Sequence, residues 1–347
     1  TDLFQSVMML IGVMILLPLV LWTAGGLERA SLVAAQHTSS DFLLAPGYSH
    51  DGRQFMPLGL AFSMFFLWVF AGVGSPAGLV RIMAGKDTQT IRRSVALLST
   101  YNMFIYLPLI AICICGRAII PDLPGKTDEI IPRLALLTTS KFTGGSLVAG
   151  FILTAPFGAV MATVSSYLVV IASALVRDVY QRFVRPDATV AQIKRLTYVV
   201  MILVGLIAFV ANLRPVAYLQ ALVVFSGTGS AVSFLVPAVM AAYWRRATAR
   251  GVLAAMVAGT AAVLTLYLIP LIAYLTTGEV QDPLIGQVTR FRPHYFLGLD
   301  PVVWGLAASL IAGVAVSLVT APPPSAVLSR LFDAPDEPRP RSLGAHA

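Results

Sequence analysis

Residues 142–176 read FTGGSLVAGFILTAPFGAVMATVSSYLVVIASALV and contain no charged side chain. A helix needs about 20 apolar residues to cross a bilayer core about 30 Å thick. This stretch is longer than that requirement, so it predicts a membrane-spanning helix. It also carries three hydroxyl side chains close together, Thr163, Ser165 and Ser166, which is unusual in so apolar a segment.

The composition of the whole chain agrees with a membrane protein. Hydrophobic residues make up 57% and charged residues 12%, with a mean hydropathy of +0.82, whereas about a quarter of the residues in soluble domains are charged. The long uncharged runs predict eight spanning helices. They cover residues 3–27, 54–80, 94–116, 142–176, 196–213, 215–244, 251–278 and 301–321.

Two other architectures fit the pattern less well. A transmembrane β-barrel requires alternating segments of about ten residues, and no such alternation is found. A soluble helical domain requires amphipathic helices, whereas these segments are apolar on all sides. The sequence therefore predicts an all-α membrane protein.

The Lys and Arg residues gather in alternate loops, after the second, fourth and sixth predicted spans. The intervening loops mix acids and bases. The positive-inside rule predicts that the basic loops and the C-terminus lie in the cytoplasm. We expect a multi-pass protein of the plasma (inner) membrane. The net charge of +8 thus indicates topology rather than nucleic-acid binding. The basic loop residues are Arg81, Lys86, Arg92, Arg93, Arg177, Arg182, Arg185, Lys194, Arg195, Arg245, Arg246 and Arg250.

Glycine and hydroxyl residues interrupt two of the spans. They occur in FAGVGSPAG (70–78) and FSGTGSAVS (225–233). Broken backbone is tolerated in a membrane where it lines a protein or water-filled cavity. We therefore expect a break at both places, as a gate or as the wall of a solute site. Ordinary helix packing is the alternative, because small residues are common in membrane helices.

Four residues of the fourth span share one helical face, at i, i+3, i+4 and i+7. They are Ala159, Ala162, Thr163 and Ser166. Hydroxyl and carbonyl oxygens on that face suit a hard monovalent cation, of which Na⁺ is the obvious one. A packing seam, with the hydroxyls bonded back to the preceding turn, is the alternative. Spacing alone leaves both open.

Ionisable residues are scarce in the spans. Asp2 lies at the start of the first span, and no Asp, Glu, His, Lys or Arg lies centrally in any span. Proton-driven carriers usually have a titratable relay at depth, so the pattern favours sodium over protons. No nucleotide-binding, zinc or catalytic-triad motif is found, and we expect neither an enzyme nor any cofactor other than Na⁺ as coupling ion.

Three smaller expectations concern other segments. Residues 128–141, DEIIPRLALLTTSK, predict a short amphipathic helix on the outer surface. Residues 322–347 have the composition of a disordered cytoplasmic tail. The chain starts at Thr1, immediately before a span and with no Met, so we expect a fragment whose partner is the missing N-terminal part of the same protein.

Several motifs, taken in order, resemble the sodium/solute symporter family, and most closely its bacterial sodium/pantothenate symporters. The resemblance extends to about residue 270. It is carried by TDLFQSVMMLIG (1–12), GSPAGLVR (74–81), GRAIIPDL (116–123), LTAPFGAVMATVSS (153–166), ALVRDVY (174–180) and YWRRATARG (243–251).

The resemblance implies a LeuT-like fold, in which a core of five plus five helices forms an inverted repeat. The first six spans then correspond to core helices five to ten, and the last two are peripheral. Residues 1–321 would form a transmembrane transporter domain that lacks core helices one to four.

The resemblance also implies functional roles. The sodium ligands would be the carbonyl oxygens of Ala159 and Ala162 and the hydroxyl of Thr163, and Asp2 would lie on the intracellular path of the ion. Two residues depart from the family pattern. Ala162 stands where many members have serine, and Ala77 stands where the sixth core helix has histidine.

The expected function is Na⁺-coupled uptake of a small organic solute, such as a pantothenate-like carboxylate, across the lipid bilayer. A monocarboxylate or proline as solute, and H⁺ as coupling ion, are alternatives within the same class. A membrane sensor module with a transporter-like domain is an alternative of another class. The candidate solute-facing residues are Trp68, Phe70, Ser75, Ser226, Thr228 and Ser230.

Overall fold

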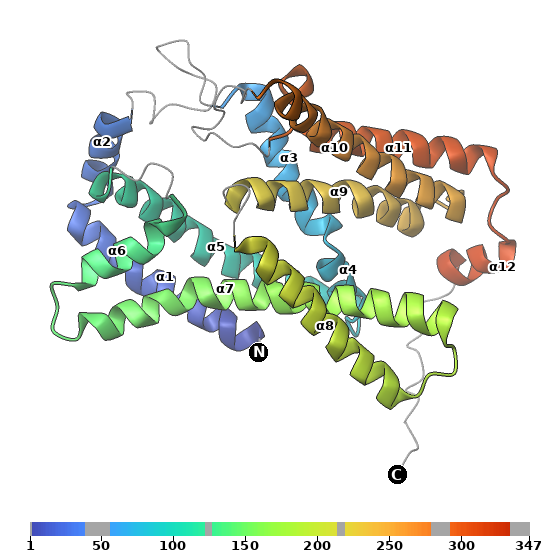
Figure 1. Ribbon diagram of the computed structural model, residues 1–347, viewed down its shortest axis with the longest axis horizontal. Coiled ribbons are helices and arrows are strands. Elements are labelled where there is room, and N and C mark those ends of the chain that lie inside the picture. Colours follow the sequence, from blue (N-terminus) through green and yellow to red (C-terminus); the bar gives the residue numbers. More distant parts are fainter. Residues whose placement is uncertain (1, 39–55, 122–126, 214–218, 279–291, 334–347) are drawn as a thin grey trace. The chain divides into compact units, whose positions relative to one another are not determined.

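The computed structural model describes residues 2–38, 56–121, 127–213, 219–278 and 292–333. All the regular elements of this described part are helices (Figure 1). The predicted helical class is therefore confirmed.

Seven helices of the described part are long and apolar enough to cross a membrane, or eight if one bent pair counts as a single span. They agree with the eight predicted spans to within a few residues at most ends. Their bounds are α1 Asp2–Ala24, the pair α3 Leu58–Gly74 and α4 Pro76–Met83, α5 Thr88–Ile119, α7 Gly145–Ser173 with its π-helical continuation η3 Ala174–Val184, α8 Val190–Asn212, α9 Leu219–Tyr243, α10 Ala249–Thr277 and α11 Pro301–Val319.

The chain divides into two compact units. Unit 1 comprises Thr1–Ala61, Pro76–Val223 and Gly278–Phe291. Unit 2 comprises Phe62–Ser75, Val224–Thr277 and Arg292–Ala347.

The core of unit 1 lies where α1, α5, α6 (Ile130–Thr139) and α7 meet. Leu16, Ile112, Leu134 and Ile152 each expose 2% or less of their surface there. The predicted helix within 128–141 is thus confirmed as α6, and one of its faces is buried against α1 and α7.

Helices α1 and α7 run antiparallel and lie side by side (Figure 1). Their approach is close at Gly12, where an added Cβ would lie 2.6 Å from Cβ of Ala155. Further along, Gly158 faces Gln5. Small residues at these crossings let the backbones approach, as is common between membrane helices. This packing brings the N-terminal end of α1 toward the second half of α7.

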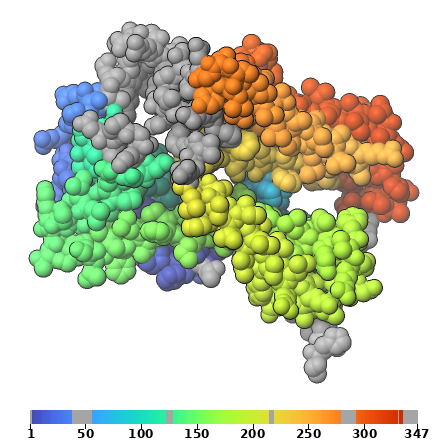
Figure 2. Space-filling view, viewed as in Figure 1, coloured from blue at the N-terminus to red at the C-terminus, as the bar shows by residue number. Residues whose placement is uncertain are grey.

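Unit 2 is built around a seam between α10 and α11, which lie against each other in Figure 2. Residues spaced four apart on each helix contact the other helix along this seam. An added Cβ on Gly259 would lie 3.0 Å from Cβ of Ser309, and one on Gly305 would lie 2.7 Å from Cγ2 of Val263. Such small residues at four-residue spacing permit tight membrane-helix packing.

The two predicted breaks have different outcomes. The second span bends by 43° between α3 and α4, where Pro76 has no backbone N–H to continue the helix. This break is confirmed. The break expected at 225–233 is wrong, because α9 is one continuous helix through that stretch. Within this helix Gly227 faces α3, where an added Cβ would lie 3.4 Å from Cβ of Ala71 and 3.6 Å from Cδ1 of Leu67, whereas no atom lies within 4 Å of one added on Gly229.

Two further segments are helical. The connection after the first span begins with a helix, α2 Leu27–Thr38. Within the expected disordered tail, α12 Ser325–Leu328 and the turn η5 Ser329–Asp333 are helical. Arg245 Nη2 lies 2.6 Å from Oδ1 of Asp333, so an ion pair holds the end of this segment. Residues 334–347 lie outside the described part.

Candidate functional site

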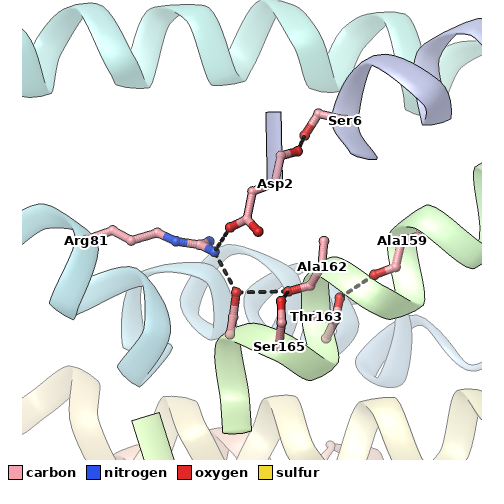
Figure 3. A network of polar contacts seen from close by, with 8 residues as sticks. Asp2, Ser6, Arg81, Ala159, Ala162, Thr163 and Ser165 are labelled. Carbon is pink, nitrogen blue, oxygen red and sulfur yellow. Dashed lines mark hydrogen bonds and ion pairs between the residues drawn. The ribbon is translucent and has the colours of Figure 1, made fainter. Parts of the chain in front are cut away.

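The predicted cation face lies on α7 in unit 1 (Figure 3). The Thr163 hydroxyl donates a hydrogen bond to the carbonyl of Ala159 at 2.9 Å. The Ser166 hydroxyl donates to the carbonyl of Ala162 at 2.9 Å, and the Ser165 hydroxyl contacts the same carbonyl at 3.1 Å. The hydroxyls therefore bond back to the preceding turn, which is the arrangement that the packing interpretation expects.

These hydrogen bonds leave further acceptor positions on the oxygens of the face. A carbonyl oxygen has two lone pairs, and a hydroxyl oxygen remains an acceptor while it donates. Thr163 is exposed and Ala159 and Ala162 are half-buried. The face can thus offer two carbonyl oxygens and one hydroxyl oxygen to a hard cation.

The face ends at an ionic cluster. Nη2 of Arg81, on α4, lies 3.0 Å from Oδ2 of Asp2 and donates a hydrogen bond of 2.6 Å to the hydroxyl of Ser166 (Figure 3). The side chains of Arg81 and Asp2 are 62% and 50% exposed. The guanidinium group therefore holds a positive charge beside the carboxylate, at the end of the oxygen-lined face.

The start of α1 is positioned by two hydrogen bonds. The Ser6 hydroxyl donates to the carbonyl of Asp2 at 2.9 Å, and the hydroxyl of Tyr101, on α5, donates to the carbonyl of Ser6 at 2.9 Å. These contacts fix the first turn of α1, and with it the Asp2 carboxylate.

Sequence reasoning assigned Arg81 only to a cytoplasmic loop and missed its place in this cluster. The available signal was its position directly after the broken span, in GSPAGLVR (74–81). Arg81 belongs to the short helix α4 that follows the break, so α4 sets the position of its side chain.

The solute candidates on α9 occupy two different faces in unit 2. Ser226 and Ser230 line a groove of about 280 Å³ against α10, where the hydroxyls of Ser233 and Thr260 lie 2.8 Å apart. Thr228 points elsewhere. It is fully buried, and its hydroxyl donates to Oδ1 of Asp300 at 3.4 Å.

The candidates on α3 are also divided. Trp68 is 54% exposed, whereas Phe70 packs against Phe66 with ring centroids 5.3 Å apart. Ser75 is half-buried and follows Gly74, where an added Cβ would lie 2.9 Å from Cα of Ala231. Within unit 2 the structure therefore brings the end of α3 to the Ser230 region of α9 and leaves Trp68 on an exposed face.

Among the described residues, no three or more His, Cys, Asp or Glu side chains lie together in a group that could hold a metal ion. The donor set of the α7 face consists of neutral oxygens with one nearby carboxylate. Such donors favour hard cations over soft ones.

Comparisons with known proteins point to one family. The family model described as "Sodium:solute symporter family" matches residues 1–259. The chain is 29% identical to the sodium/pantothenate symporter of Escherichia coli over 90% of this chain and 58% of that protein. It is 32% identical to the sodium/pantothenate symporter of Haemophilus influenzae, over 75% of this chain and 51% of that protein.

A third relative is the osmoregulated proline transporter OpuE of Bacillus subtilis, which is 26% identical over 77% of this chain and 49% of that protein. The chain thus spans about half the length of the curated relatives it matches. The all-α architecture agrees with the LeuT-like fold expected for such transporters. With the family model matching most of its length, the chain belongs to the sodium:solute symporter family.

Proposed function

We propose that the whole protein is a secondary active transporter that couples Na⁺ entry to the uptake of a small organic carboxylate resembling pantothenate. The observation that carries the proposal is the oxygen-lined face of α7 that ends at Asp2 and Arg81. Family membership and the two sodium/pantothenate symporters among the relatives support it.

Three oxygens of α7 would contact the sodium ion. They are the carbonyls of Ala159 and Ala162 and the hydroxyl of Thr163, with Ser166 completing the polar face. A bound cation would favour the state that accepts solute, and solute binding would then allow the change to the inward-facing state. The differential affinity of the two states for Na⁺ supplies the coupling.

Asp2 and Arg81 would act at the cytoplasmic end of the ion path. The Asp2 carboxylate attracts the released cation. Arg81 offers the carboxylate an alternative positive partner at 3.0 Å, and this competition favours release of the ion. The positive-inside rule supports this orientation, since Arg81 belongs to a basic loop. By the same rule the C-terminus would lie in the cytoplasm, and the proposed uptake of solute into the cell would put the protein in the plasma (inner) membrane.

Solute would contact the Ser226–Ser230 groove and the neighbouring end of α3. Hydroxyl groups there could donate to a carboxylate, as small polar groups in an otherwise apolar pocket commonly do. Ala77, which stands where the family pattern has histidine, is 8% exposed and leaves no polar side chain at that position.

The experiment is uptake of radiolabelled pantothenate by proteoliposomes that contain the whole protein. An inward Na⁺ gradient should drive accumulation above the external concentration, and an equal K⁺ gradient should not. Accumulation that is the same with either gradient would contradict the sodium coupling.

Proline is the second candidate solute, because one relative is a proline transporter. The same vesicles decide between the two. Unlabelled pantothenate and unlabelled proline are each added in excess, and the true solute is the one that abolishes labelled uptake at the lower concentration. A monocarboxylate such as lactate completes the panel.

A further inference from the structure

A carboxyl group is buried inside unit 2, at a place where the sequence suggested only the edge of a span. Asp300 precedes α11 and exposes none of its surface. Its Oδ1 accepts hydrogen bonds from the backbone N–H of Val302 at 2.9 Å and from the Thr228 hydroxyl at 3.4 Å. Its Oδ2 is buried and has no hydrogen-bond partner among the described residues.

The burial arises because the segment before α11 folds back onto α10. The backbone N–H of His294 donates to the carbonyl of Leu266 at 2.8 Å. This contact carries the following residues toward Tyr267, which is 6% exposed and stacks edge-on against Phe225 with centroids 4.8 Å apart. Asp300 is thereby enclosed by α9, α10 and α11.

No basic group of these helices is close enough to neutralise an ionised Asp300. Helices α9 and α11 contain no charged residue, and α10 contains only Arg250, in its first turn. The titratable group that acts electrostatically with Asp300 is Tyr267 of α10, and Tyr267 also interacts with Tyr295 of the segment before α11. That segment also carries Arg292 and His294, and α3 contributes no charged side chain.

An isolated buried carboxylate is costly, and such groups usually become neutral instead. A metal cation is a poor occupant here. Hard metal cations take several oxygen ligands, whereas Oδ1 already faces two donor groups, the Thr228 hydroxyl and the Val302 N–H. A proton needs only the free Oδ2.

We propose that Asp300 is a proton-binding site inside the α9–α10–α11 bundle, with the proton on Oδ2 and the Thr228 and Val302 donors on Oδ1. The ligand is H⁺ and the site is separate from the α7 face. It does not depend on which solute or coupling ion the transporter uses. Because Thr228 lies between Ser226 and Ser230, loss of the proton acts on the helix that lines the candidate solute groove.

Burial supports this assignment, since it raises the pKa of Asp300 from 3.8 to about 6. The two hydrogen bonds to Oδ1 act in the opposite direction, because they stabilise the charged form. The site therefore exchanges its proton near neutral pH, and removal of the Thr228 donor should strengthen proton binding.

The test is infrared difference spectroscopy of the whole protein in lipid, titrated from acid to alkaline pH in potassium buffer. The wild type should show a carboxylic-acid C=O band that disappears with a midpoint near pH 6. Asp300→Asn should lose this band, and Thr228→Val should shift the midpoint to higher pH. Asn is also a good N-cap residue, so Asp300→Asn preserves the start of α11.

Asp333→Asn is the matched control, because it removes an exposed carboxylate of the same unit. It should leave the band unchanged. A band that persists in Asp300→Asn, or a Thr228→Val midpoint that stays or falls, would overturn the proposal. So would a wild-type midpoint that moves when Na⁺ replaces K⁺ at constant ionic strength, because this would assign the site to a metal cation. Transport is not measured, so a failure of the symport proposal would leave this result intact.

Discussion

Replacing Arg81 by glutamine tests whether its guanidinium competes with the transported cation for Asp2. The structure places Nη2 of Arg81 3.0 Å from the Asp2 carboxylate and 2.6 Å from the Ser166 hydroxyl. Glutamine removes the charge and leaves an uncharged polar side chain. The Asp2 carboxylate then loses its competing cation, so it should hold Na⁺ more tightly from the cytoplasmic side.

The size of the effect follows from the exposure of the pair. Both side chains are half-exposed or more, and exposed ion pairs contribute about 0.2–1 kcal/mol. At 1.4 kcal/mol per tenfold change, this corresponds to a decrease of about 1.4- to 5-fold in the cytoplasmic Na⁺ concentration that half-inhibits uptake. Screening by salt should reduce the difference.

The assay is solute uptake by proteoliposomes loaded with increasing internal Na⁺ at constant ionic strength. Arg81→Lys keeps the charge and should resemble the wild type. Arg245→Gln is the matched control, because its pair with Asp333 has nearly the same exposure and a distance of 2.6 Å. If Arg81→Gln and Arg245→Gln give the same internal Na⁺ sensitivity, the competition argument is refuted.

Three further outcomes are expected. Thr163→Ala should raise the external Na⁺ concentration for half-maximal uptake about fivefold, because the loss of one oxygen ligand costs about 1 kcal/mol of Na⁺ binding. Ser165→Ala should leave this concentration unchanged. Equal effects in the two variants would remove Thr163 from the site. Gly305→Ala should lower the melting temperature, because its Cβ would lie 2.7 Å from Cγ2 of Val263 across the seam between α10 and α11. Gly150→Ala, where no atom lies within 4 Å, should be neutral or stabilising. A reversed order of the two melting temperatures would contradict the seam. The folded state binds the Asp300 proton more tightly than the unfolded state, so the free energy of unfolding should fall by about 3 kcal/mol as the pH rises from well below 3.8 to well above about 6. Asp300→Asn should not lose stability over this pH range, so its melting temperature should exceed that of the wild type above pH 6. Parallel pH profiles of the two melting temperatures would contradict this prediction.

Much of the fold could be predicted from the sequence because charge is so costly in a bilayer. Uncharged runs located every span, and Pro76 located the bend between α3 and α4. The glycines of α9 misled, because glycine both breaks helices and permits close packing. Gly227 lies next to Ala71 and Leu67 of α3, and such neighbours from another helix cannot be read from the local sequence.

The site was less predictable, because most of its contacts join residues of different helices. Helical spacing placed Ala159, Ala162, Thr163 and Ser166 on one face, but could not show that their hydroxyls bond back within the helix. Arg81 and Asp2 are 79 residues apart in sequence, and no local pattern links them. Asp300 is buried by a segment that folds back onto α10, which hydropathy cannot detect.

The coupling of Na⁺ entry to solute uptake is tested most directly by the entry of radiolabelled sodium into proteoliposomes, measured with and without the solute outside. Coupled transport requires each ligand to promote the entry of the other. We expect pantothenate, or whichever solute competes best, to accelerate sodium entry, and Thr163→Ala to weaken this acceleration. Sodium entry that is unchanged by any transported solute would contradict sodium-coupled transport.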